Sequence, residues 1–124
     1  MKASADEVLW TDLLEKYKCS SKWNALLAWA QENLAEYPTI NVTNFTSDWS
    51  DGRAFCALIH HFRPGMVNPF KLMEPKLCTL LAVQLAEKLK MHVDQATFLE
   101  LAKDYKNVMA VVFELYKKLD TDEQ

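Results

Sequence analysis

The strongest constraint on this chain's fold is an apolar run, AFCALI, at residues 54–59. As a helix, this segment has apolar residues on nearly every side, because alanine and cysteine fill the spaces between its large side chains. Its buried stripe is formed by Phe55, Leu58, Ile59 and Phe62. A helix without a polar face belongs in the middle of a core. We therefore expect a central helix with Ser50 as its N-cap, Asp51 in its first turn and its end before Pro64.

Apolar periodicity predicts further helices on both sides of the central one. With only two glycines and four prolines, the chain has few turn-forming residues for a many-stranded β protein. Apolar residues at helical spacing predict helices over 6–18, 22–36, 76–90, 95–103 and 105–119. Pro38 is expected to end the second of these helices. Leu80 is expected to face the core. Residues 38–49 and 66–75 read as loops, the latter with a single turn around 69–72.

The predicted fold class is a compact all-α bundle of four longer helices with short connecting helices and an N-terminal amphipathic helix. The 124 residues fit one domain. We expect an N-terminal helix and joint over residues 1–21, the domain itself over 22–119 and a polar tail over 120–124.

Charge and cysteine content limit the class of protein. The net charge of −3 disfavours a nucleic-acid partner, because such proteins usually carry a basic excess. Cys19, Cys56 and Cys78 form an odd and widely spaced set, which is typical of reduced thiols in a cytosolic protein. The N-terminus has acids where a signal peptide would be apolar, and no apolar run approaches the ~20 residues that span a bilayer. These features predict a cytoplasmic protein.

An enzyme or a metal site is the main alternative for the central helix. Cys56 and His60 are four residues apart and share a helix face, which suits a nucleophile pair or two metal ligands. A structural zinc site needs about four ligands, and only Cys78, His61 and His92 remain to supply them. The chain also lacks CxxC and HExxH spacings and a glycine-rich phosphate loop. The sequence therefore predicts no catalytic residue, no metal and no cofactor.

Several segments together resemble a known family. In order they are WNALLAWAQ, INVTNF, DWSDGRAFCALIHHFRPG, a long apolar helix and NVMAVVFELYKKL. This series is similar to a calponin homology domain and covers residues 22–119. The central motif is specific: tryptophan, one residue, Asp-Gly, an apolar run, Ile-His and Arg-Pro. The segments ALLAWAQ and AFCALIHHFRP resemble the second repeat of tandem actin-binding modules and the single domains of cytoskeletal adaptors. That resemblance implies weak or supporting actin binding.

Within the motif, most residues are expected to have structural roles. This set comprises Trp23, Trp49, Asp51, Gly52, Phe55 and His60. Trp49 is expected to pack its ring on the central helix, and Asp51 to satisfy local amides. Gly52 is placed in the first helical turn, where a side chain would collide with backbone. His60 is expected to form a hydrogen bond with a loop carbonyl.

A membrane-binding role is a further alternative for the loop before the central helix. In some relatives of the second-repeat type, a tyrosine and basic residues in the loop before the central helix contribute to phosphoinositide binding. This chain has Tyr37, but it has no lysine or arginine between residues 23 and 52. A phosphate site without cations loses its main electrostatic attraction. Phosphoinositide binding is therefore not expected.

Two faces are candidates for partner binding. The first is the N-terminal helix, whose apolar stripe of Val8, Leu9, Leu13 and Leu14 lies beside Trp10. Docking on its own domain is favoured over a free face, because isolated helices of about 12 residues are marginal in water. Trp10, if exposed, would anchor a partner. The second face is a basic set formed by Lys88, Lys90, Lys103 and Lys106, which could meet an acidic surface such as an actin filament.

The functional hypothesis is a non-catalytic protein-interaction module of a larger cytoskeletal or signalling protein. Its expected partner is an actin filament or an actin-associated protein, with weak or supporting actin binding. The alternative is a regulatory domain that docks within its own parent, restraining a Rho-type signalling activity without direct actin binding. Neighbouring domains would discriminate between the two hypotheses.

Overall fold

The computed structural model describes residues 5–49, 52–68, 75–91 and 104–120. Five α-helices occur in this part of the chain: α1 (Ala5–Lys16), α2 (Lys22–Asn33), α3 (Arg53–Phe62), α4 (Pro75–Lys88) and α6 (Tyr105–Leu119). Two short 3-10 helices, η1 (Ser47–Trp49) and η2 (Pro64–Met66), are additional to the predicted elements. No strand occurs within these described residues, and the predicted all-α class is confirmed.

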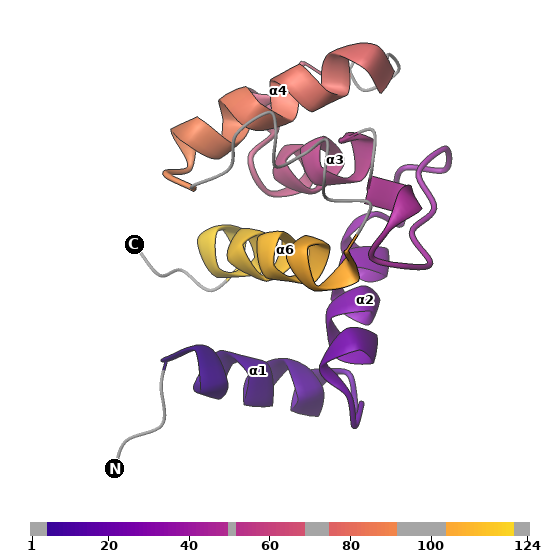
Figure 1. Ribbon diagram of the computed structural model, residues 1–124, viewed down its shortest axis with the longest axis vertical. Helices are drawn as coiled ribbons and strands as arrows, with labels where there is room; N and C mark the ends of the chain where they lie inside the picture. Colours follow the sequence, from indigo (N-terminus) through magenta and orange to yellow (C-terminus); the bar gives the residue numbers. More distant parts are fainter. Residues whose placement is uncertain (1–4, 50–51, 69–74, 92–103, 121–124) are drawn as a thin grey trace.

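The central helix α3 occupies the middle of the fold. Figure 1 shows α3 between α4 and α6, with α2 standing across one end of these helices and α1 beyond α6. α3 also packs against α2, η1 and η2. Every residue from 54 to 59 is at most 1% exposed. The prediction that this apolar run forms a buried central helix is therefore confirmed.

The predicted start of α3 is wrong by two residues. The helix begins at Arg53, and Gly52 is its N-cap with φ 79°, in the left-handed region. The backbone N–H of Cys56 donates to the Gly52 carbonyl at 3.0 Å, and the cap has no side-chain hydrogen bond. Gly52 therefore lies before the first turn, and the reason for glycine there is its positive φ. Ser50 and Asp51 lie outside the described residues.

Two other predicted helix positions need correction. α2 ends at Asn33, before residue 36, so Pro38 does not terminate it; the C-cap Leu34 has already left helical geometry at φ −107°. The N-terminal helix ends at Lys16 and not at 18, because Lys18 adopts a left-handed φ of 53°. The predicted helix over 95–103 and the turn around 69–72 lie outside the described residues.

Leu80 does not face the core as expected, since it is 51% exposed. The buried face of α4 is formed by Cys78, Ala82, Leu85 and Ala86. Leu80 follows Cys78 by two residues and precedes Ala82 by two, which is about 200° around a helix from each. Leu80 therefore lies on the outer side of α4, because the packed face is formed by the small residues Cys78, Ala82 and Ala86 together with Leu85.

The N-terminal helix α1 docks on the domain, as the sequence favoured. Leu13 is 1% exposed and belongs to the common core. The Trp10 ring stacks on Phe113 of α6 with centroids 4.1 Å apart and planes 8° from parallel. At one end of the helix, Lys117 Nζ pairs with Asp6 Oδ1 at 3.1 Å. The contacts of Asp6 and Trp10 dock the N-terminal half of α1 on α6.

The other end of α1 is held by a tyrosine. The Tyr17 hydroxyl donates to the Glu32 carboxylate of α2. Burial, followed by this bond, raises the pKa of Tyr17. Val8, a member of the predicted apolar stripe, is 49% exposed. The docking face of α1 is therefore centred on Leu13 and Trp10, and Val8 does not take part in it.

The first prediction concerns the α1 interface. Trp10→Ala should lower the free energy of unfolding by about 2–3 kcal/mol, because the stacked indole is lost and leaves a gap beside Phe113. Val8→Ala is the matched control on the same helix and should change stability by less than about 0.5 kcal/mol. Urea unfolding followed by circular dichroism measures both. Equal effects of the two variants would contradict the docked position of α1.

The second prediction compares the two glycines. Gly52→Ala should destabilise the protein by about 1–2 kcal/mol, because an alanine at φ 79° is strained. Gly65→Ala should be neutral or stabilising by up to about 1 kcal/mol, since an added Cβ at Gly65 meets no atom within 4 Å. Thermal unfolding of both variants tests this difference. The proposed cap geometry fails if Gly52→Ala is as stable as the unsubstituted protein.

Candidate interaction surface

The aromatic residues of the central motif join the loop before α3 to the core. Trp49 is buried, and its indole Nε1–H donates to the Asn44 carbonyl at 2.8 Å. The Trp49 ring stacks on Phe45, with centroids 6.0 Å apart, and Trp23 meets the same Phe45 ring edge-on at 4.9 Å. Phe55 is buried in α3. These side chains hold the segment between α2 and α3 in place.

His60 contacts a tyrosine and not a loop carbonyl, which corrects the expected partner. Its Nδ1 lies 2.6 Å from the hydroxyl of Tyr37. Burial, together with the nearby Glu36 carboxylate, raises the pKa of Tyr37 to about 12. The hydroxyl therefore keeps its proton at neutral pH and is able to donate. This contact was missed because Tyr37 is 23 residues away in sequence.

The adjacent histidine makes a second tie to the same segment. His61 Nδ1 lies 2.7 Å from Glu36 Oε1. This hydrogen bond holds the pKa of Glu36 below its usual value. Two consecutive residues of α3 thus bind two consecutive residues that follow α2. The histidines of the central motif position the chain between α2 and α3.

The thiol and imidazole of the possible catalytic pair have separate structural partners. Cys56 is fully buried, and its Sγ–H donates to the Cys78 carbonyl of α4 at 3.4 Å. His60 is bonded to Tyr37. Within the described residues, no group of three or more His, Cys, Asp or Glu side chains is placed to hold a metal. His92 lies outside the described residues.

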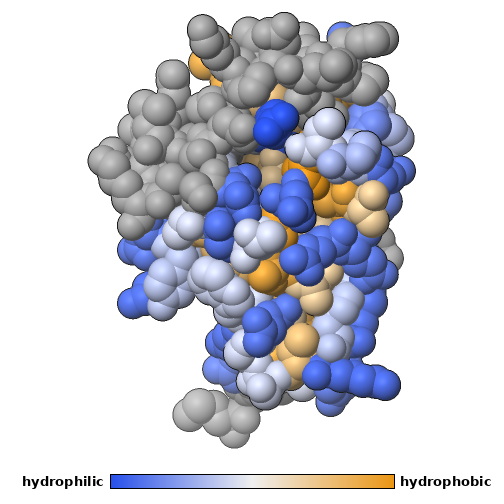
Figure 2. All heavy atoms as spheres, turned by 90° about the vertical axis from the view of Figure 1, so that its right-hand side faces the viewer, coloured by the Kyte–Doolittle hydropathy of each residue, from blue (hydrophilic) through white to orange (hydrophobic). Residues whose placement is uncertain are grey.

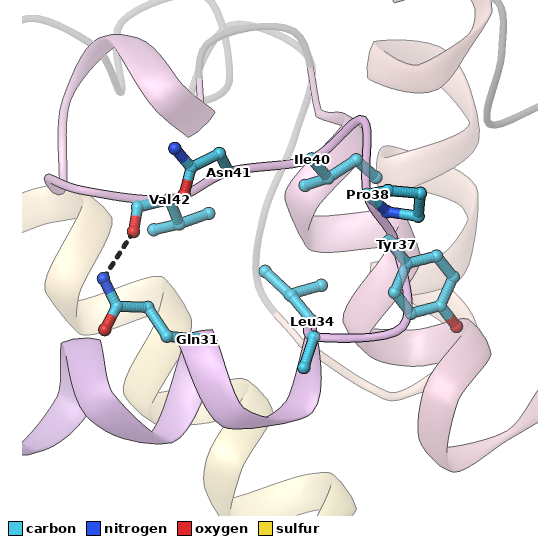
Figure 3. Close-up of a pocket in the computed structure, with 8 residues that line it drawn as sticks. Gln31, Leu34, Tyr37, Pro38, Ile40, Asn41 and Val42 are labelled. Atoms are coloured by element: carbon cyan, nitrogen blue, oxygen red, sulfur yellow. Dashed lines mark hydrogen bonds between the residues drawn. The ribbon is translucent and has the colours of Figure 1, made fainter.

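A surface pocket of about 300 Å³ lies between the end of α2 and the chain that follows it. Figure 3 shows Leu34, Tyr37 and Ile40 around it, with Gln31 Nε2 donating to the Val42 carbonyl at 2.8 Å. Its described lining carries no lysine or arginine. A pocket of this composition offers little attraction to a phosphate. No helix in the described segments has the length and apolar character needed to cross a bilayer.

The predicted basic set does not gather on one face. Lys88 and Lys90 are exposed at the end of α4, and Lys106 is exposed in the first turn of α6. Figure 1 shows the last turn of α4 and the last turn of α6 on the same side of the molecule. Lys106 is in the first turn of α6, so it lies on the side opposite to Lys88. Lys103 lies outside the described residues. The lysines therefore mark two separate surfaces.

Lys106 has different neighbours from those expected. The adjacent Tyr105, 43% exposed, meets Trp23 of α2 with ring centroids 5.3 Å apart. Lys22 is exposed beside Trp23, and its Nζ lies 5.3 Å from the Trp10 ring centroid. Figure 2 views the molecule from the side of α2 and shows apolar side chains between hydrophilic ones. The adjacent lysine and aromatic residues, KW at 22–23 and YK at 105–106, are the sequence signal from which this surface could have been predicted.

The third prediction tests the contact between Tyr37 and His60. Tyr37→Phe removes the hydroxyl and should lower the free energy of unfolding by about 1 kcal/mol, because one hydrogen bond is lost. Tyr105→Phe is the control, since Tyr105 is largely exposed, and should leave stability within about 0.5 kcal/mol. Chemical unfolding at neutral pH measures both. Indistinguishable unfolding midpoints would contradict the role given to Tyr37.

Comparison with known proteins places the fold in a family. A family model of the calponin homology (CH) domain matches residues 20–121. Cytospin-A of Rattus norvegicus is 39% identical over 107 residues, covering 82% of this chain and 10% of the relative. The [F-actin]-monooxygenase MICAL1 of the same species is 40% identical over 79 residues, covering 62% of this chain and 8% of the relative. The chain spans about a tenth of the length of these relatives. It belongs to the calponin homology domain family.

Proposed function

We propose that this domain is a non-catalytic interaction module of a larger cytoskeletal protein and associates weakly, or in a supporting role, with actin filaments. The observation that carries the proposal is its membership of the calponin homology family over residues 20–121. One relative is named for an activity on F-actin. The likeness of the central motif to second repeats supports a low affinity. A cytoplasmic, cytoskeleton-associated location follows from the same proposal.

The chemistry of the described residues is consistent with binding without turnover. The Cys56 thiol is buried against a carbonyl, and the His60 and His61 imidazoles contact Tyr37 and Glu36. The monooxygenase match covers 8% of that enzyme's length, so its catalytic activity does not transfer to this domain. The exposed lysines at the end of α4 and the start of α6 supply the charges that an acidic filament would attract.

The alternative is that the domain docks within its own parent and restrains a Rho-type signalling activity. One observation favours it: α1 precedes the family match, which starts at residue 20, yet it packs on α6 through Trp10. A flanking segment of the same chain is thus already bound to the domain surface. In this alternative, other parts of the parent would bind in the same way.

The fourth prediction is salt-sensitive co-sedimentation with actin filaments. The purified domain should pellet with filaments at low salt and pellet less at moderate salt, because the Debye length falls to about 8–10 Å near 0.1–0.15 M. Sedimentation without filaments is the control for aggregation. A domain that stays in the supernatant at both salt concentrations would contradict actin association and favour docking within the parent.

A further inference from the structure

We propose that the surface where α1, α2 and α6 meet binds an acidic protein segment that inserts an apolar side chain. This aromatic–lysine face consists of Trp10, Lys22, Trp23, Tyr105 and Lys106. The inference rests on the proposed function as a binding module, and it adds the site and the chemistry of the partner. It replaces the basic set expected from the sequence, because Lys106 is separated from Lys88 and Lys90.

The members of the face are linked by two contacts and by the adjacency of Lys22 to Trp23 and of Tyr105 to Lys106 in the chain. Tyr105 and Trp23 meet edge-on at 5.3 Å, which joins the start of α6 to the start of α2. Lys22 Nζ lies 5.3 Å from the Trp10 ring centroid, which joins α2 to α1. The rings are half-buried or exposed and their inner sides rest on Phe45 and Phe113. Such rigid, partly exposed aromatic residues are the side chains that most often anchor partners.

Two indole N–H groups of this face have no acceptor among the described residues. The indole N–H groups of Trp29 and Trp49 are bonded to Asp120 and to the Asn44 carbonyl. In the described part of the chain, the indole N–H groups of Trp10 and Trp23 have no such acceptor. A partner that supplies carboxylates or carbonyls would satisfy these donors.

Among the described residues, no carboxylate forms an ion pair with either lysine of the face. Lys117 pairs with Asp6 and Glu114, whereas no ion pair of Lys22 or Lys106 occurs among the described residues. The neighbouring Asp104 carboxylate caps α6 by accepting the Lys106 backbone N–H at 2.9 Å. The Asp104 carboxylate keeps its negative charge in this cap, so the two ammonium groups exceed it by one, whereas the whole chain carries −3. Electrostatic complementarity points to an acidic partner.

A protein segment fits this face better than a membrane or a nucleic acid does. Lipid surfaces and nucleic acids are held by clusters of several cations, and this face has two lysines. Two lysines suffice to pair with two carboxylates. One apolar side chain of the partner would lie across the exposed Tyr105 ring and the adjoining Trp23 ring.

The test uses a short synthetic peptide of aspartate and glutamate with one central phenylalanine as the probe. Binding should shift the indole N–H signals of Trp10 and Trp23 in nitrogen-15 NMR spectra and leave those of Trp29 and Trp49 unchanged. Replacing the phenylalanine of the probe by serine should weaken binding, because the apolar anchor is lost. Shifts confined to Trp29, Trp49 or the end of α4 would overturn the proposal.

Two double variants test which lysines contribute to peptide binding. Lys22→Glu with Lys106→Glu should weaken peptide binding at least about tenfold. Lys88→Glu with Lys90→Glu is the matched control, with the same change of net charge on the other side, and should retain affinity within about twofold. Equal losses in the two double variants would mean that only overall charge matters and would overturn the site. Lys106→Glu alone preserves the contact between Lys22 and Trp10, and thermal unfolding verifies that each variant is folded.

Filament pelleting separates this inference from the proposed function. If filaments do not pellet the domain but the peptide binds at the aromatic–lysine face, actin association fails and the face stands. In another outcome, the double variant at Lys22 and Lys106 pellets with filaments as well as the unsubstituted domain does and also binds the peptide normally. Actin association then stands, and the aromatic–lysine face is refuted. Loss of both activities in this variant alone supports the face as the filament contact as well.

Discussion

The burial of α3 on all sides is the constraint on which the rest of the structure depends. Residues 54–59 are at most 1% exposed, and the burial of each large apolar side chain among them contributes about 1.5–3 kcal/mol. A helix without a polar face has to be covered on every side, by α4, α6, α2 and the two 3-10 helices. Polar contacts of α3 occur at its start, at its histidine end and at the Cys56 thiol. The positive φ of Gly52 and the ties from His60 and His61 occur at the two ends.

Burial of α3 also explains why the polar atoms of the central motif have structural partners. A thiol inside a core needs a local acceptor, and Cys56 finds the Cys78 carbonyl of α4. The histidines lie at the rim of the core and reach Tyr37 and Glu36 of the chain after α2. The Cys56–His60 spacing suits a catalytic pair, but in this structure His60 holds the chain between α2 and α3 in place. Function is left to the outer surfaces, where aromatic rings and lysines remain accessible.

Periodicity could predict the helices of this fold because long apolar stripes determine them. It could not predict their ends, which depend on backbone geometry: the left-handed φ of Gly52 and Lys18 sets boundaries that side-chain patterns do not encode. Nor could it find contacts between distant segments, such as Tyr37 with His60 or Trp10 with Phe113. The separation of the lysines also depends on the tertiary structure. Lys88 is in the last turn of α4 and Lys106 in the first turn of α6, and Figure 1 shows these two helix ends on different sides.

The docked position of α1 links stability to recognition. The Trp10 ring stacks on Phe113, and the Lys22 ammonium lies 5.3 Å from the centroid of the same ring. One indole therefore belongs both to the contact with α6 and to the aromatic–lysine face. A partner carboxylate that pairs with Lys22 would compete with the attraction between that ammonium and the ring. A partner that also accepts the Trp10 N–H would instead hold the ring in place. Binding at this face and docking of α1 are therefore thermodynamically coupled, and the sign of that coupling depends on which donor the partner uses.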